Sequence, residues 1–219
     1  MAVPVLIIGK SGSGKTSSLR TVVDNDNFNV INVIGKPFPF RGNIKSGVSD
    51  DYQQVMKWLI KFPGKSIVID DAGYLLTNMF MKGHASSGSG NAIFAFYNDL
   101  GDKFWNLIEF IKKSVPQNKI VYIVMHEDQD DFGNVKPKTI GKMLDDKVCI
   151  EGMFTIVLRC VTRNGKHVFL TQTDGLDVAK TPIGLFDTEE IDNDILFVDN
   201  AIREYYGLDA GEDTKKERG

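Results

Sequence analysis

Residues 9–16 read Gly-Lys-Ser-Gly-Ser-Gly-Lys-Thr, and their types and spacing suit the binding of phosphate groups. The glycines let the backbone bend so that several N–H groups point inward at an anion. Lys15 adds a positive charge, and the Thr16 hydroxyl is a ligand for Mg²⁺. A plain turn between strand and helix is the alternative. We expect nucleotide contacts from Gly9, Ser11, Gly12, Ser13, Gly14, Lys15, Thr16 and Ser17.

A pair of carboxylates, Asp70 and Asp71, follows the apolar run 66–69. A carboxylate at the end of such a strand binds Mg²⁺, usually through water, opposite the hydroxyl of the phosphate-binding loop. We predict this metal role for Asp70. Asp71 is the candidate to orient or deprotonate an attacking water, and Glu127 is its rival. For Asp71, capping of a helix or a turn is the alternative.

Two further side chains are candidates for contact with a terminal phosphate. His126 follows the apolar strand expected at 119–125, where a polar residue senses a γ-phosphate by hydrogen bonding. Lys180 stands in a loop and could serve a neighbouring subunit, because a cation supplied in trans stabilises phosphoryl charge. A solvated loop residue is the alternative for each. We expect His84 to be solvated and His167 to face outward from a strand.

Three segments are candidates for contact with nucleic acid or a partner. Residues 35–47 combine basic residues with phenylalanines, which suits single strands unless the rings fold inward. Residues 136–147 are rich in lysine, partly offset by two aspartates. Residues 83–90 are rich in Gly and Ser, so we expect them to be mobile and to order on a partner. The basic and aromatic residues are Lys36, Phe38, Phe40, Arg41, Lys45, Lys136, Lys138, Lys142 and Lys147.

Bulk composition narrows the class of protein. The 219 residues are 42% hydrophobic and 25% charged, which is typical of a soluble globular chain. The net charge of −3 gives no global basic field, so nucleic acid would need a local patch. Cys149 and Cys160 form no metal motif or disulfide framework, which suits a reducing cytoplasm. No apolar stretch reaches membrane-spanning length, and we expect no signal peptide.

The order of expected elements predicts the fold class. Strands alternate with helices, then an Asn-Gly turn joins two strands into a hairpin. This order predicts an α/β fold with a mostly parallel sheet, helices on both faces and an antiparallel hairpin edge. Ligands bind such sheets beyond the carboxyl ends of the strands. The expected strands are 3–9, 28–34, 66–69, 119–125, 153–162 and 166–173, and the expected helices are 15–23, about 50–62, a long one ending before Pro116, 139–145 and 189–206.

The long helix has its own pattern, with Phe104, Leu107, Ile108, Ile111 and Val115 on one face. The helix near residue 50 places Tyr52, Val55, Met56, Leu59 and Ile60 on a buried stripe and can be capped by Ser49 or Asp50. We predict one domain over residues 1–206 and a flexible polar tail over 207–219.

Several blocks resemble a family of phage-encoded RecA-like P-loop ATPases, related to the Sak-type single-strand annealing and recombination proteins. Besides GKSGSGKT and IVIDD, the blocks are Phe104-Trp105, VYIVMHED at 121–128, KTIGKML at 138–144, EGMFT at 151–155 and AKTPIGLFD at 179–187. The resemblance covers most of the chain, and the last block is the most family-like. The phosphate-binding loop itself is shared with many unrelated proteins.

The resemblance implies a RecA-like fold, ATP and Mg²⁺ as cofactors, and slow, DNA-linked hydrolysis in an oligomer with nucleotide near the subunit interfaces. It implies a role with single-stranded DNA in phage recombination or replication, in the cytoplasm of a bacterial host, and makes a single-strand binding protein a candidate partner. Lys180 would match the trans-acting lysine of RecA-like assemblies.

The chain departs from that pattern after the second strand. RecA-like enzymes often carry a catalytic Glu there, whereas this sequence reads Val-Ile-Gly-Lys at 33–36. Base activation would then fall to Asp71 or Glu127. A nucleotide-gated, non-catalytic partner of a recombination or replication protein is therefore an alternative. A small-molecule kinase is another, but the arginines are scattered and form no lid-like cluster.

Overall fold

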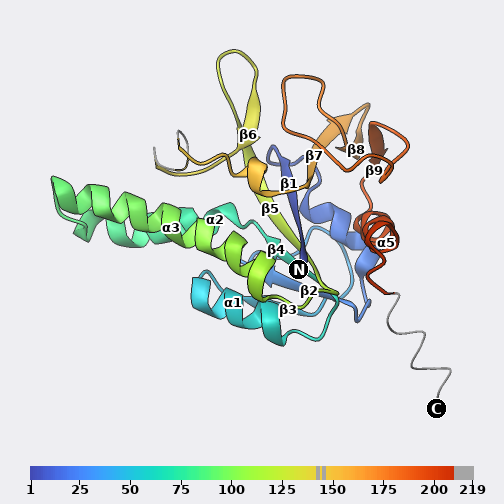
Figure 1. The fold of residues 1–219 in the computed structure, drawn as a ribbon, viewed down its shortest axis with the longest axis horizontal. Helices are drawn as coiled ribbons and strands as arrows, with labels where there is room; N and C mark the ends of the chain where they lie inside the picture. The colour runs from blue at the N-terminus through green and yellow to red at the C-terminus, as the bar shows by residue number, and fades with distance from the viewer. Residues whose placement is uncertain (142–143, 145–146, 210–219) are drawn as a thin grey trace.

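A computed structural model describes residues 1–141, 144 and 147–209 of the chain. A nine-stranded sheet runs in the order β3-β2-β4-β5-β1-β7-β8-β9, with β6 paired to β5 (Figure 1). The strands are β1 (Val3–Gly9), β2 (Phe28–Asn32), β3 (Ser46–Val48), β4 (Ser66–Asp70), β5 (Ile120–Gln129), β6 (Val135–Pro137), β7 (Ile156–Arg163), β8 (Lys166–Leu170) and β9 (Glu190–Asp192).

The pairing confirms the predicted sheet. The pairs β3–β2, β2–β4, β4–β5, β5–β1 and β1–β7 are parallel, and β7–β8–β9 form an antiparallel edge. The turn between β7 and β8 has positive φ at Asn164 (52°) and Gly165 (76°), as an Asn-Gly hairpin turn requires. Gly9 pairs with His126 in the register of β1 and β5. The loops that carry the predicted chemistry therefore leave the same end of the sheet.

Helices cover both faces of the sheet because successive side chains of each buried strand point to opposite faces. Leu6 and Ile8 of β1 enter a core with α1 (Tyr52–Lys61), α2 (Gly73–Gly83) and α3 (Asn91–Ser114). Val5 and Ile7 enter a second core with the 3₁₀ helix η1 (Thr16–Val22) and α5 (Ile195–Tyr206). Helices α2 and α3 extend together away from the sheet (Figure 1).

Helix α3 confirms the stripe predicted from its sequence. Phe104, Leu107, Ile108 and Ile111 are fully buried, and Val115 follows the last helical residue. Pro116 then excludes a further helical turn because it lacks an N–H. In α1, by contrast, Ile60 is 42% exposed, so the predicted stripe is one residue too long.

Three other expectations near the N-terminal half are corrected, and two short elements are added. The helix predicted at 15–23 is the seven-residue 3₁₀ helix η1. The second strand ends at Asn32 instead of residue 34, and β3 was not predicted. The cap of α1 is Asp51, whose side chain accepts from the Gln54 N–H, instead of Ser49 or Asp50. Within 83–90, residues His84–Ser86 form a short 3₁₀ helix, η2.

Further corrections concern the C-terminal half. The segment 126–129, predicted as loop, continues β5 and pairs with β6. Residues 189–194, predicted as the start of the last helix, contain β9, and α5 begins at Ile195 after its cap Asp194. Of the helix predicted at 139–145, residues 139–141 are not helical. Residues 142, 143, 145 and 146, and most of the predicted tail, lie outside the described residues. Among the described helices, none is long and apolar enough to cross a membrane.

Candidate nucleotide site

The phosphate-binding loop leaves β1 at Gly9 and has the backbone that its glycines allow. Gly12 and Gly14 have φ of +79° and +101°, a region that other residues rarely adopt. A Cβ atom added at Gly9 would lie 2.5 Å from the Cys160 carbonyl oxygen. The loop is therefore held both by backbone conformation and by close packing against β7.

Lys15 is the buried cation of the loop. Its Nζ donates to the carbonyl oxygens of Gly9 at 2.7 Å and Lys10 at 2.8 Å. Burial lowers the pKa of Lys15 below its ordinary value, because desolvation disfavours the charged form. The amine thus lies at the mouth of the loop, held by carbonyls that a phosphate group would replace as its partners.

Thr16 and Asp70 face each other across the loop. The Thr16 hydroxyl donates to both carboxylate oxygens of Asp70, at 3.0 and 3.2 Å. Asp70 is 1% exposed, and burial, helped by the charge of Asp71, raises its pKa to about 6. One hydroxyl beside one carboxylate is the protein contribution that Mg²⁺ takes when phosphates and waters supply its other ligands.

Two observations test whether Mg²⁺ and nucleotide fit these residues. The buried Ser13 hydroxyl oxygen has no hydrogen-bond partner within the described part of the chain, which leaves it free for a ligand in the loop. No group of three or more His, Cys, Asp and Glu among the described residues could hold a metal by itself. The Ser13 hydroxyl thus fits a ligand bound in the loop, beside which Thr16 and Asp70 would hold Mg²⁺.

Asp71 lies next to Asp70 with a strained backbone, at φ +57°. It is 2% exposed and forms an ion pair with Lys36. Its Oδ1 also lies 3.6 Å from Nε2 of His126. The structure therefore brings together two of the predicted catalytic residues, Asp71 and His126, and adds Lys36, which the sequence had suggested only for nucleic acid.

His126 connects this pair to the loop. Its Nδ1 lies 3.5 Å from Nζ of Lys15, and its ring packs edge-on against Tyr74. Burial, and then the charge of Lys15, lower the pKa of His126, so the imidazole is neutral at physiological pH. A neutral imidazole beside Lys15 has the hydrogen-bonding groups needed to sense a terminal phosphate.

Glu127 sits differently from its rival Asp71. Arg159 donates to both of its carboxylate oxygens, from Nε at 2.9 Å and Nη2 at 3.0 Å. A third nitrogen of Arg159 binds Asp177 at 3.1 Å. Because both oxygens of Glu127 already accept from a guanidinium, its role as a base has less geometric support than that of Asp71.

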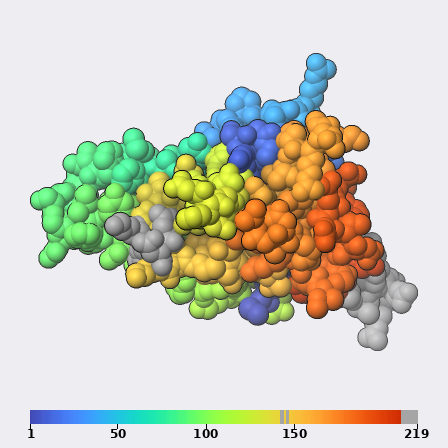
Figure 2. Space-filling model, turned by 90° about the horizontal axis from the view of Figure 1, so that it is seen from above, coloured from blue at the N-terminus to red at the C-terminus, as the bar shows by residue number. Residues whose placement is uncertain are grey.

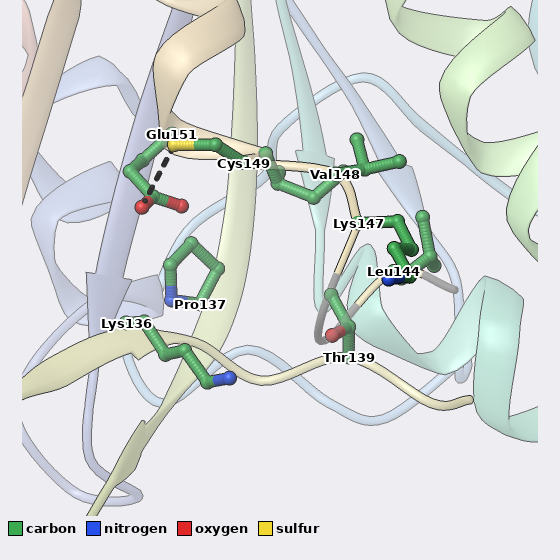
Figure 3. A pocket seen from close by; sticks show the side chains of 9 residues that line it. Lys136, Pro137, Thr139, Leu144, Lys147, Val148, Cys149 and Glu151 are labelled. Carbon is green, nitrogen blue, oxygen red and sulfur yellow. Dashed lines mark hydrogen bonds between the residues drawn. The ribbon is translucent and has the colours of Figure 1, made fainter. Parts of the chain in front are cut away.

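Lys180 is in the loop after β8 and pairs by its backbone with Val157 of β7. Its positive charge favours the thiolate form of Cys149, although burial and Glu151 outweigh it and raise the pKa of that thiol. The Cys149 thiol donates to Glu151 at 3.1 Å, and both residues line a cavity of about 280 Å³ (Figure 3). This cavity is lined by β6 and the segment 147–151, with no residue of the phosphate-binding loop among its described lining. The trans role of Lys180 stays a prediction.

A support behind the loop was missed by the sequence reading. The Cys160 thiol donates to the Ser13 carbonyl at 3.0 Å, and the Asn193 amide donates to the Cys160 sulfur at 3.3 Å. Arg20 in turn binds Asn193. His167, which we expected to face outward, packs against Gly14, where an added Cβ would lie 2.5 Å from its ring. No sequence pattern links residues so distant in the chain.

Side chains in the segments predicted to bind nucleic acid are partly engaged within the protein. Phe38 and Phe40 stack on each other with ring centroids 5.4 Å apart and pack against the second core, as the inward alternative expects. Lys45 pairs with Asp26. His84 is exposed, as predicted, and its ring stacks on Phe80.

A cavity of about 560 Å³ opens beside the loop. Tyr74 gives it an aromatic wall and Lys138 a cation. The dark blue loop region lies at the surface between the light blue segment after β2, the yellow β5–β6 segment and the orange C-terminal segments (Figure 2). The lining residues are Lys10, Ser11, Gly73, Tyr74, Thr77, His126, Glu127, Lys138, Thr139 and Ile140.

The two cysteines should differ sharply in reactivity. Burial, and then Glu151, raise the pKa of the Cys149 thiol, and burial raises that of Cys160 to about 11, but Cys149 is exposed and Cys160 is buried. We expect a maleimide to modify Cys149 in the folded protein and Cys160 only after unfolding, because reagents need access and the thiolate form. Mass spectrometry of peptides checks this. Labelling of native Cys149→Ser would contradict the burial of Cys160.

Comparison with known proteins agrees with the geometry of the phosphate-binding loop. A sequence search finds no matching curated protein. A family model described as an AAA domain matches residues 1–183, which include the phosphate-binding loop, both aspartates and Lys180. Because the match covers most of the chain, this protein belongs to that family of AAA-domain P-loop proteins.

Proposed function

We propose that the protein is an ATP-binding, Mg²⁺-dependent ATPase of the RecA-like type. The observation that carries this proposal is that the phosphate-binding loop places Lys15 at its mouth and Thr16 in contact with Asp70 at the end of β4. Lys15 would bind the β- and γ-phosphates, and Thr16 with Asp70 would hold Mg²⁺, which neutralises charge on the phosphates. Asp71 and His126, next to Lys15, would orient the attacking water and contact the terminal phosphate.

We further propose that the ATPase acts on or with single-stranded DNA in a homo-oligomer. Support comes from the cavity beside the loop, where Lys10 and Lys138 provide cations and Tyr74 an aromatic ring. Single strands are bound by this combination of phosphate contact and base stacking. The homo-oligomer, phage origin, recombination and a single-strand binding protein as partner rest on the resemblance of the sequence blocks.

A nucleotide-gated, non-catalytic partner protein is the second candidate. It is favoured by one observation, which is that both candidate bases are held in ion pairs, Asp71 by Lys36 and Glu127 by Arg159. Such a protein would bind ATP tightly without hydrolysing it, and DNA would have no effect.

Steady-state hydrolysis with Mg²⁺, measured with and without single-stranded DNA, separates the two. We expect slow basal turnover that single-stranded DNA stimulates and duplex DNA stimulates less. Tight ATP binding with no DNA effect would support the partner protein instead, and phosphoryl transfer to an added metabolite would support a kinase. If stimulation is seen, mixing wild-type and Lys180→Ala subunits tests the trans role. If Lys180 acts in trans, a subunit loses ATPase activity when its neighbour carries the substitution, even if its own Lys180 is intact.

A further inference from the structure

The loop after β2 brings a second lysine to the nucleotide site. Lys36 forms an ion pair with Oδ2 of Asp71, and their side chains are 43% and 2% exposed. One end of this pair is therefore buried at the edge of the sheet, and the other reaches solvent.

Hydrogen bonds fix the backbone of this loop next to Lys36. Asn32, buried at the end of β2, accepts from the Gly35 N–H at 2.9 Å and donates to the Lys36 carbonyl at 2.7 Å. Gly35 has a φ of +68°, and an added Cβ would lie 3.1 Å from Val48. A side-chain amide and a glycine thus hold the backbone on both sides of Lys36.

A chain of contacts connects Lys36 to the phosphate-binding loop. Asp71 lies between Lys36 and His126, and His126 contacts Lys15. Burial opposes the charge on Lys36, but the hydrogen bond and charge of Asp71 outweigh it and raise the pKa of Lys36. Lys36 is therefore a permanent cation on the same side of the loop as the groups that converge on a terminal phosphate.

We propose that Lys36 binds the terminal phosphate of the nucleoside triphosphate and so distinguishes ATP from ADP. This inference rests on the proposed function, because it assumes that the loop binds ATP. Without nucleotide, Lys36 is neutralised by Asp71. With ATP bound, the γ-phosphate would offer a second anion to the Lys36 side chain, which is 43% exposed. ADP lacks that group and gains nothing from Lys36.

Binding of fluorescent ATP and ADP analogues with Mg²⁺ to Lys36→Ala tests the proposal. We expect affinity for the triphosphate to fall by about tenfold, which equals about 1.4 kcal/mol, and affinity for the diphosphate to change by less than about twofold. Use of a non-hydrolysable triphosphate keeps turnover out of the measurement. Lys36→Arg retains the charge and should keep most of the preference for the triphosphate.

Lys45→Ala is the matched control, because Lys45 lies in the same loop and pairs with Asp26 instead of a site residue. It should change neither affinity. Equal losses for both nucleotides, or no loss, in Lys36→Ala would overturn the inference. Should the alanine variant fail to fold, Lys36→Gln, which retains a donor to Asp71, takes its place. A wild-type protein that binds neither nucleotide would instead contradict the proposed function itself.

Discussion

Replacement of Lys15 by alanine is expected to abolish ATP hydrolysis, with a loss of at least about 10²–10³-fold in turnover. Lys15 is the buried cation of the loop, and its amine lies within 2.7–2.8 Å of two loop carbonyls where phosphate oxygens would bind. No other lysine of the loop can replace it, because the Lys10 side chain is directed to Gln129. Release of phosphate with Mg²⁺, with and without single-stranded DNA, measures the effect.

Lys61→Ala provides the matched control for this experiment. Lys61 is an exposed lysine at the end of α1, before β4 begins, so its loss removes the same charge at the end of the sheet opposite the loop. Circular dichroism and a thermal melt of both variants show that the fold is retained. Hydrolysis that survives in Lys15→Ala at the wild-type rate would remove the loop from the catalytic site.

Replacement of Arg159 by methionine is expected to destabilise the fold by about 3–5 kcal/mol. Arg159 binds Glu127 and Asp177, whose side chains are 2% and 0% exposed, and its removal leaves two buried carboxylates without a cation. For a chain of this size the loss corresponds to a fall in Tm of roughly 6–20 °C. Differential scanning calorimetry or urea unfolding measures it.

Arg163→Met on the same strand is the comparison for this prediction. Arg163 pairs with Glu190 at the surface, with side chains 54% and 39% exposed, so its loss should cost less than about 1 kcal/mol. Equal destabilisation of the two variants would show that the Glu127–Arg159–Asp177 cluster has no special weight. Because β5 carries both Glu127 and His126, we also expect nucleotide affinity to fall in Arg159→Met.

Local sequence was sufficient to predict the elements whose signals act over a few residues. The run 66–71 predicts a buried strand ending in two acids, because apolar residues in continuous sequence suit a strand covered on both faces. The stripe of α3 and the Asn-Gly turn of the hairpin were predicted for the same reason. Boundaries such as the start of α5 were wrong where a short edge strand, β9, competes with a helical pattern.

The sequence alone therefore determined the ligand class and the sheet, because a glycine-rich loop between strand and helix and a buried strand ending in aspartate are local patterns. Only the tertiary structure decided the partners of each charge. Lys36 reaches Asp71, Arg159 engages Glu127, and His167 packs on Gly14, across separations that no periodicity encodes. A buried charge takes whichever opposite charge the fold brings within contact, so the choice between Asp71 and Glu127 as base depends on that packing.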